Sequence, residues 1–182
     1  MSGRIVTRAL CVAVFVAAVS AMTALAQQPP SGQTQPQENW SAYLPPGDGK
    51  ALVVSRCTVC HDLRGMMQLR KAPPGWEAIV LDMGARGAPI TLDEIDPLVK
   101  YLSTAFGPQA PPFTDANSAS KAELTKLPGV APEAADRLIA RRGGAPLTSD
   151  EQVRTAFGLD TQAFDKIRYY VYVKPEAPGK RQ

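Results

Sequence analysis

The stretch Cys57-Thr58-Val59-Cys60-His61 (CTVCH) decides the interpretation of this 182-residue chain. It combines two of the three cysteines with the single histidine of the whole sequence. The preceding residues, Lys50 to Arg56, include the apolar side chains of Leu52 and Val53. They predict a short helix that runs into Cys57. Two thiols are therefore expected at a helix end, three positions apart, with an imidazole directly after the second.

This pattern is the attachment motif of c-type haem. Each thiol adds to one vinyl group of the porphyrin, and the histidine supplies the proximal nitrogen to the iron. Three other interpretations stay open: a structural zinc site, a thioredoxin-like redox pair and a plain disulfide. A zinc site wants four nitrogen or sulfur ligands. A redox pair would stand in a βαβ pattern, and a disulfide needs no histidine. The sequence therefore favours one covalently bound haem, with Cys57 and Cys60 as attachment residues and His61 on the iron.

A methionine is the expected second iron ligand, because the chain has no second histidine. Met66 and Met67 follow His61 too closely to reach the opposite face of a haem, so we expect them at its edge. Met83 lies 22 residues beyond His61, on a helical face with Trp76, Ile79 and Val80. Met83 is therefore the predicted distal ligand, with simple core packing as the alternative.

The segments before this motif predict export. Residues 1–26 combine Arg4 and Arg8, an apolar run and the small-residue pattern Ala24-Leu25-Ala26, as in a cleaved signal peptide. An uncleaved membrane anchor is the alternative, and no later stretch is apolar enough to span a membrane.

Removing the leader leaves 18 basic and 17 acidic residues, a net charge of +1, so the composition carries no nucleic-acid signature. Residues 27–43, rich in Gln and Pro at first, are expected to form a disordered tether in the periplasm.

Residues 44–107 resemble a small class I-like cytochrome c domain. The features that carry the resemblance are the helix with Gly49 and Leu52, the CTVCH motif, the later Met83 and a closing helix with Val99, Tyr101 and Leu102. The run from Gly75 to Gly87 is similar to that of haem subunits beside periplasmic dehydrogenases. Thr91 and Glu94 have the spacing of a capping box for the closing helix, although Pro97 follows within it. The resemblance implies an all-α domain that carries electrons.

A proline-rich linker, residues 108–112, leads to a second helical unit over 113–173 and a polar tail over 174–182. The second unit resembles the helix-hairpin-helix domain of competence-type DNA receptors, on the strength of N-S-A-S-K-A-E-L (117–124), L-P-G-V (127–130), A-D-R-L-I-A-R-R (135–142) and F-G-L (157–159). Gly129 and Gly158 mark two turns 29 residues apart, which suggests an internal duplication. No segment alternates with period two, so we expect no real sheet.

The second resemblance implies a phosphate site at the first hairpin, formed by Gly129, Val130 and Ala131 with Lys126 nearby. Two departures weigh against it. The usual second glycine of each hairpin is replaced by Ala131 and by Asp160, and the unit is electroneutral, whereas phosphate binding needs an excess of positive charge. The candidates for a local basic patch are Lys121, Lys126, Arg137, Arg141 and Arg142.

Two functions follow from these observations. The first is a periplasmic c-type cytochrome that is not an enzyme by itself, docks through its hairpin module and passes electrons to a redox partner such as a dehydrogenase or an oxidase. The second is a DNA-binding or DNA-uptake protein with an attached haem domain. A haem subunit of a periplasmic dehydrogenase complex differs from the first only in its partner.

Overall fold

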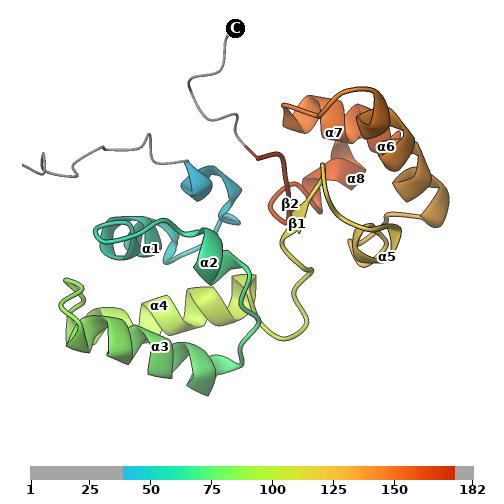
Figure 1. Ribbon diagram of the computed structural model, residues 1–182. Helices are drawn as coiled ribbons and strands as arrows, with labels where there is room; N and C mark the ends of the chain where they lie inside the picture. The colour runs from blue at the N-terminus through green and yellow to red at the C-terminus, as the bar shows by residue number, and fades with distance from the viewer. Residues whose placement is uncertain (1–38, 175–182) are drawn as a thin grey trace, which may run out of the picture. The chain divides into compact units, whose positions relative to one another are not determined.

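The structure is a computed structural model that describes residues 39–174. The expected signal peptide (1–26), most of the tether and the tail after Lys174 lie outside the described residues. The described part is mainly helical (Figure 1), as the sequence predicts. It falls within a single compact unit, in which we distinguish an N-terminal lobe (39–107) and a C-terminal lobe (113–173).

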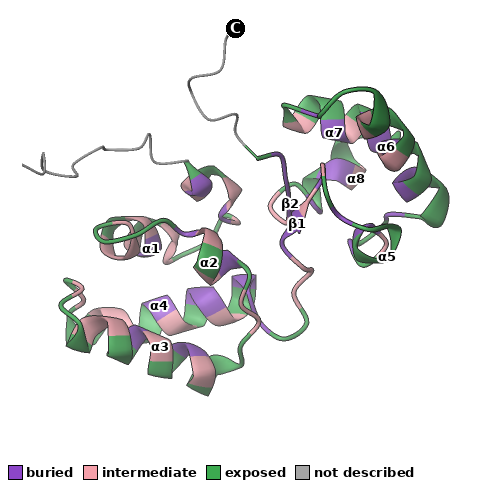
Figure 2. Cartoon of the chain, viewed as in Figure 1, coloured by how far each residue is buried: buried purple, intermediate pink, exposed green. Residues whose placement is uncertain are grey.

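The N-terminal lobe is built from one 3₁₀ helix and four α-helices. They are η1 (Trp40–Tyr43), α1 (Lys50–Cys57), α2 (Arg64–Met67), α3 (Pro73–Ala85) and α4 (Leu92–Ala105). Helices α3 and α4 pack along one another, and α1 packs on α4 (Figure 1). Each long helix turns a buried face to the others and an exposed face to solvent (Figure 2). The buried faces meet in one core cluster that includes Val53, Trp76, Leu98 and Leu102.

Helical structure in this lobe includes residues that the sequence analysis assigned to the tether. Residues 40–43, expected within the tether, form η1, and the Trp40 side chain is only 2% exposed. Trp40 packs edge-on against Phe113, with ring centroids 5.9 Å apart. Burial of so large an aromatic surface stabilises the packing of η1 against the lobe.

Helix α1 crosses α4 at a glycine. Gly49 is the N-cap of α1 and has a left-handed backbone, with φ of +102°. A Cβ atom at this position would lie 2.7 Å from Cβ of Tyr101 and 3.1 Å from the Pro97 carbonyl oxygen. Only glycine combines this backbone conformation with so close an approach. The crossing fixes the helix that ends in Cys57.

Helix α4 begins with the predicted capping box. Thr91 and Glu94 are reciprocally bonded, and the Thr91 amide donates to Glu94 Oε2 at 3.1 Å. Pro97 is the sixth residue of the helix, so the helix continues through the proline rather than beginning at it. A proline there removes one intrahelical hydrogen bond, and the capping box with Asp93 and Glu94 in the first turn stabilises the same end.

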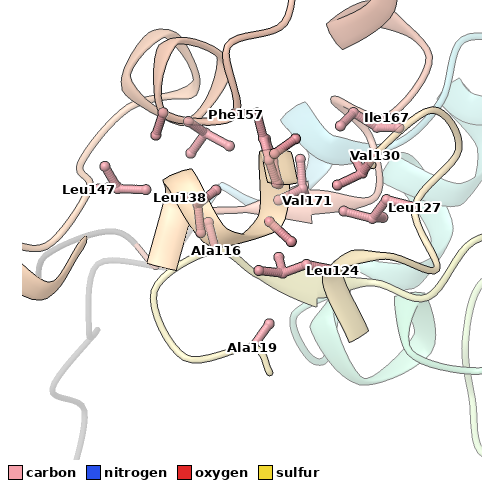
Figure 3. Close-up of a cluster of buried hydrophobic side chains, with 14 of the residues drawn as sticks. Ala116, Ala119, Leu124, Leu127, Val130, Leu138, Leu147, Phe157, Ile167 and Val171 are labelled. Carbon is pink, nitrogen blue, oxygen red and sulfur yellow. The ribbon is translucent and has the colours of Figure 1, made fainter. Parts of the chain in front are cut away.

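The C-terminal lobe folds as two helical hairpins. Its elements are β1 (Thr114–Asp115), α5 (Lys121–Leu124), α6 (Pro132–Gly144), α7 (Asp150–Phe157), α8 (Thr161–Asp165) and β2 (Val171–Tyr172). Side chains from every helix meet in a core around Leu124, Leu138, Phe157 and Ile167 (Figure 3). This is the hairpin arrangement that the apolar spacing predicts.

The two strands differ from the prediction of no sheet. β1 and β2 pair in parallel, Thr114 with Val171 and Asp115 with Tyr172. Each strand has only two residues, which is too short for an alternating pattern to show in the sequence. The ladder joins the two ends of the C-terminal lobe.

Arg70 fixes the proline-rich linker. Its guanidinium donates to the carbonyl oxygens of Ala110 and Pro111, and also to those of Met67 and Leu69. Burial lowers the pKa of Arg70, but its four carbonyl partners satisfy the charged group. The linker is therefore held to the N-terminal lobe by hydrogen bonds as well as stiffened by its prolines.

Candidate functional site

The N-terminal lobe contains a cavity of about 360 Å³ that brings the predicted haem-binding residues together. Cys57, Cys60, His61 and Met83 all line it. The volume lies within the range of about 300–1,000 Å³ that is typical of small-molecule sites. Residues separated by up to 26 positions in the chain therefore meet at one site.

Helix α1 and the turn after it place the two cysteines. Cys57 is the last residue of α1, and Cys60 lies in the following turn, where Thr58 Oγ1 donates to the Val54 carbonyl at 2.6 Å. Both thiols are free, and burial raises the pKa of the Cys57 thiol. The pair is not joined as a disulfide, and both sulfur-bearing residues face the cavity as a bifunctional attachment site requires.

The imidazole of His61 is oriented by the backbone. Its Nδ1 atom lies 2.6 Å from the carbonyl oxygen of Asp62. A carbonyl only accepts, so Nδ1 carries a proton, and in the neutral ring Nε2 is then the nitrogen with the lone pair. A histidine that ligates a metal typically donates its other ring nitrogen to such an oxygen. His61 therefore has the tautomer that metal ligation through Nε2 needs.

The three methionines have different places. Met83, on α3, and Met66, on α2, both line the cavity. Met67 is fully buried in the core of the lobe and is not part of the cavity wall, whereas the sequence suggested an edge position for both neighbours. Met83 shares its helix face with Trp76, Ile79 and Val80, all of which line the cavity as the spacing predicts.

The remaining wall is almost wholly apolar. It comes from α3, α4, the connection between them and the segment after α2, and its larger members are Leu69, Trp76, Ile79, Val80, Ile90, Leu98 and Leu102. Trp76 is fully buried, and its indole Nε1 donates to the Phe106 carbonyl at 3.2 Å, so this polar atom does not face the cavity unpaired. Such a wall excludes water from whatever occupies the space.

Two arginines that the sequence analysis did not single out also line the cavity. Arg56 pairs with Glu94, Nη2 to Oε1 at 2.6 Å, and Arg86 pairs with Asp82, Nε to Oδ2 at 2.8 Å. The Arg56 guanidinium and the Thr91 backbone together lower the pKa of Glu94 to about 2. Arg56 directly precedes Cys57, and Arg86 follows Met83 by three residues. This closeness to the predicted haem-binding residues is the signal in the sequence that could have placed both arginines at the cavity.

Across residues 39–174, no group of three or more His, Cys, Asp or Glu side chains is arranged to hold a metal ion. No helix in this same range is long and apolar enough to cross a lipid bilayer.

The first hairpin of the C-terminal lobe carries the residues assigned to a phosphate. Gly129 has a left-handed backbone, with φ of +77°, and Lys126 is exposed. The Val130 amide, however, donates to the Leu127 carbonyl at 3.2 Å, and the side chain is buried in the core. Val130 is therefore part of the turn and of the core, whereas the sequence predicted that it contacts a phosphate. Ala131 is the N-cap of α6 and offers no side-chain cap, and an acidic residue, Glu133, stands in the first turn of the helix.

The second hairpin provides its own anion. The Asp160 carboxylate caps α8, accepting a hydrogen bond from the Ala163 amide at 2.7 Å. Gly158 matches Gly129 in its left-handed backbone, with φ of +69°. The two turns share a conformation, but a carboxylate stands at the second helix N-terminus, where a phosphate would otherwise be attracted.

Most members of the expected basic patch hold the lobe together instead. Lys121 pairs with Asp136 at 2.7 Å. Arg137 donates to the Phe157 carbonyl, and Arg142 to the carbonyls of Ala116 and Ala119. Among the residues that the structure describes, Lys126 and Arg141 make no ion pair.

Comparison with known proteins bears on this second lobe alone. Residues 114–172 match the family model of the helix-hairpin-helix motif. No curated protein matches the chain, and no solved structure matches it. The matched range runs from β1 to β2, so it takes in both hairpins and the strand pair that joins their ends. The chain therefore carries a helix-hairpin-helix motif over residues 114–172.

Proposed function

We propose that the chain is a c-type cytochrome, an electron carrier with one covalent haem in the cavity of its N-terminal lobe. Cys57 and Cys60 would hold the porphyrin through thioether bonds, and His61 and Met83 would bind the iron. The single observation that carries the proposal is that these four side chains line one apolar cavity. The orientation of the His61 ring, with Nδ1 bonded to a carbonyl oxygen, supports it independently.

The donor set and the wall fit this group. Haem, when bound, supplies one iron that gains or loses a single electron. The chain contributes two free thiols at the required spacing, one imidazole and one thioether sulfur. Its apolar wall excludes water and gives a large porphyrin surface a place to be buried. That burial also adds core to a lobe of about 70 residues, a size at which the protein core alone is marginal.

The setting of this activity belongs to the proposal. Covalent haem attachment and the leader-like residues 1–26 together favour export to the periplasm. The electron would pass to a redox partner protein, a dehydrogenase or an oxidase, with the C-terminal lobe as a docking module. On this proposal the chain is not an enzyme by itself but an electron carrier or the haem subunit of an oxidoreductase complex.

Intact mass and a pyridine haemochrome spectrum test the cofactor. The chain is expressed with a haem-attachment system and compared with a Cys57→Ser/Cys60→Ser variant. We expect the wild-type chain alone to gain the mass of one haem and to give a spectrum with both vinyl groups saturated. A wild-type chain that matures without any increment in mass overturns the proposal.

A second candidate, nucleic-acid binding through the C-terminal lobe, is supported by the helix-hairpin-helix match over residues 114–172. The open N-terminus of α6, with Gly129 and Ala131 exposed beside Lys126, is its contact site. Glu133 and the Asp160 cap oppose it, because each places a carboxylate where a phosphate would lie.

A gel-shift assay at low salt separates the two candidates. The second candidate predicts binding that falls steeply with salt and weakens in Lys126→Glu but not in the matched control Lys166→Glu, an exposed lysine just after α8. If duplex DNA is not retarded even at low salt, the second candidate is excluded and the electron carrier stands alone.

A further inference from the structure

We propose that Arg56 and Arg86 form an anion-binding edge of the cavity and recognise the two carboxylates of the porphyrin. The inference rests on the proposed haem function and assigns residues to the part of the group that the four ligating side chains leave untouched. Among the side chains that line the cavity, these two are the only ones with a permanent charge, and no acidic side chain lines it. An apolar wall with two cations matches a flat apolar molecule with two carboxylates.

Arg56 is held so that part of its guanidinium stays available. Its Nε and Nη2 atoms donate to the Glu94 carboxylate at 2.6–3.1 Å, while no hydrogen bond is present at Nη1 in the described residues. A guanidinium has five N–H groups in a planar fork, so a second carboxylate can be bound beside the first. The side chain is about one-third exposed, at the last turn of α1 and directly before Cys57.

Glu94 acts as the positioning residue for this arginine. It belongs to the capping box at the start of α4, where it also accepts from the Thr91 amide. Only 12% of its side chain is exposed. Since the bond from the Thr91 amide fixes the carboxylate, the guanidinium bonded to it has little freedom, which lowers the entropic cost of binding a further anion.

Arg86 approaches the same cavity from the end of α3. Its Nε atom donates to Asp82 Oδ2 at 2.8 Å, and both terminal nitrogens lack a hydrogen bond in the described residues. The residue is the C-cap of α3, and the connection to α4 that follows contributes Ala88 and Ile90 to the cavity wall. Arg86 and Glu94, the partner of Arg56, stand eight residues apart on either side of this connection.

A purely structural role is the competing explanation, because both arginines already pair with a carboxylate of the chain. Such a role predicts a loss of stability on substitution, but no dependence on the chemistry of the ligand. Binding selectivity and reduction potential are therefore the readouts that separate the two explanations.

The first experiment measures selectivity without covalent attachment. The full chain with Cys57→Ser/Cys60→Ser is titrated with iron protoporphyrin IX and with its dimethyl ester, which lacks the charges. We expect a preference for the diacid that falls about tenfold in Arg56→Gln or Arg86→Gln, as the loss of one charge-assisted hydrogen bond implies. Arg141→Gln, the same substitution on an exposed arginine of α6, keeps the preference. Equal affinity of the chain for diacid and ester overturns the inference.

The second experiment uses the mature haem protein and measures its midpoint potential. Loss of a nearby positive charge favours the oxidised iron, so Arg56→Gln and Arg86→Gln shift the potential downward relative to Arg141→Gln. Glu94→Gln keeps a residue suited to the capping box but removes a negative charge, so it shifts the midpoint potential upward. A chain that attaches no haem defeats the proposed function itself. If haem attaches and the arginine variants match Arg141→Gln in potential, the carboxylate assignment alone fails.

Discussion

Phe113 and Tyr172 stack with ring centroids 4.5 Å apart and planes inclined by 28°. Phe113 lies between the proline-rich linker and β1, whereas Tyr172 is the last residue of β2. Tyr172 also packs edge-on against Trp40 at 5.1 Å, and its hydroxyl accepts from Arg64 Nη2 at 3.1 Å. A residue near the end of the helix-hairpin-helix motif thus belongs to the core cluster of the N-terminal lobe.

Replacing this tyrosine is expected to destabilise the whole described unit. Tyr172→Ala removes an almost fully buried ring and should lower the free energy of unfolding by about 3 kcal/mol. Tyr172→Phe keeps the ring and loses only the bond from Arg64, at a cost of about 1 kcal/mol. Urea denaturation of both variants gives the two values. Equal values for both variants would show that the hydroxyl, not the stack, is responsible.

If the chain carries the proposed haem, substitution of the methionines tests which of them binds the iron. Met83→Ala should abolish the weak methionine–iron charge-transfer band near the red end of the visible spectrum. Met66→Ala removes the other methionine of the cavity wall and should leave that band in place. Absorption spectra of the two oxidised variants answer the question. The reverse pattern would assign the ligand to Met66, and survival of the band in both would exclude a methionine from either position.

Acid should weaken the fold through Glu94. Its pKa is about 2 in the folded chain against 4.5 for an ordinary glutamate, chiefly because Arg56 donates to the ionised carboxylate. The unfolded chain therefore binds a proton at a higher pH than the folded chain does, so stability is full above about pH 5 and falls toward pH 2. Urea denaturation at a series of pH values gives the free energy of unfolding, and its dependence on pH should be flatter for Glu94→Gln than for the wild type. The control is Glu77→Gln, an exposed position of α3, and a wild-type slope in Glu94→Gln would contradict the assignment.

The cap of α8 is expected to be structural. Asp160→Ala should cost about 1 kcal/mol, because the Ala163 amide loses its partner. Asp160→Asn keeps an accepting oxygen and should retain most of that stability. Thermal unfolding of the pair measures the difference. An alanine variant as stable as the wild type would mean that the carboxylate contributes nothing to the hairpin.

Local patterns in the sequence predicted much of this architecture. The spacing of Trp76, Ile79, Val80 and Met83 identified the face of α3 that lines the cavity. The Thr91–Glu94 spacing marked the start of α4, and Gly129 and Gly158 marked the two turns. These features depend on residues within one or two helical turns of each other, so the chain itself displays them.

Such local patterns could not predict which residues meet in the tertiary structure. Arg70 reaches carbonyl oxygens 40 and 41 residues away, and Arg56 meets Glu94 across 38 residues. Nothing local distinguishes these arginines from solvated ones, or shows that Arg137 and Arg142 satisfy backbone carbonyls rather than face a phosphate. The capping residue of α7 shows the same limit at short range. Thr148 and Glu151 have the spacing of a capping box, but Ser149 is the cap, and its side chain accepts from the Gln152 amide.

The contact between Gly49 and Tyr101 restricts how this lobe can vary over evolutionary time. A saturation library at position 49 should return glycine almost alone, since every other residue meets both the left-handed backbone and the tyrosine Cβ. A smaller side chain at 101 would still carry the clashing Cβ atom, and only glycine there would remove it, leaving the left-handed backbone at 49 and the Pro97 carbonyl oxygen in place. Distant homologues of the lobe should therefore retain this glycine, a usable anchor for aligning sequences that have otherwise diverged.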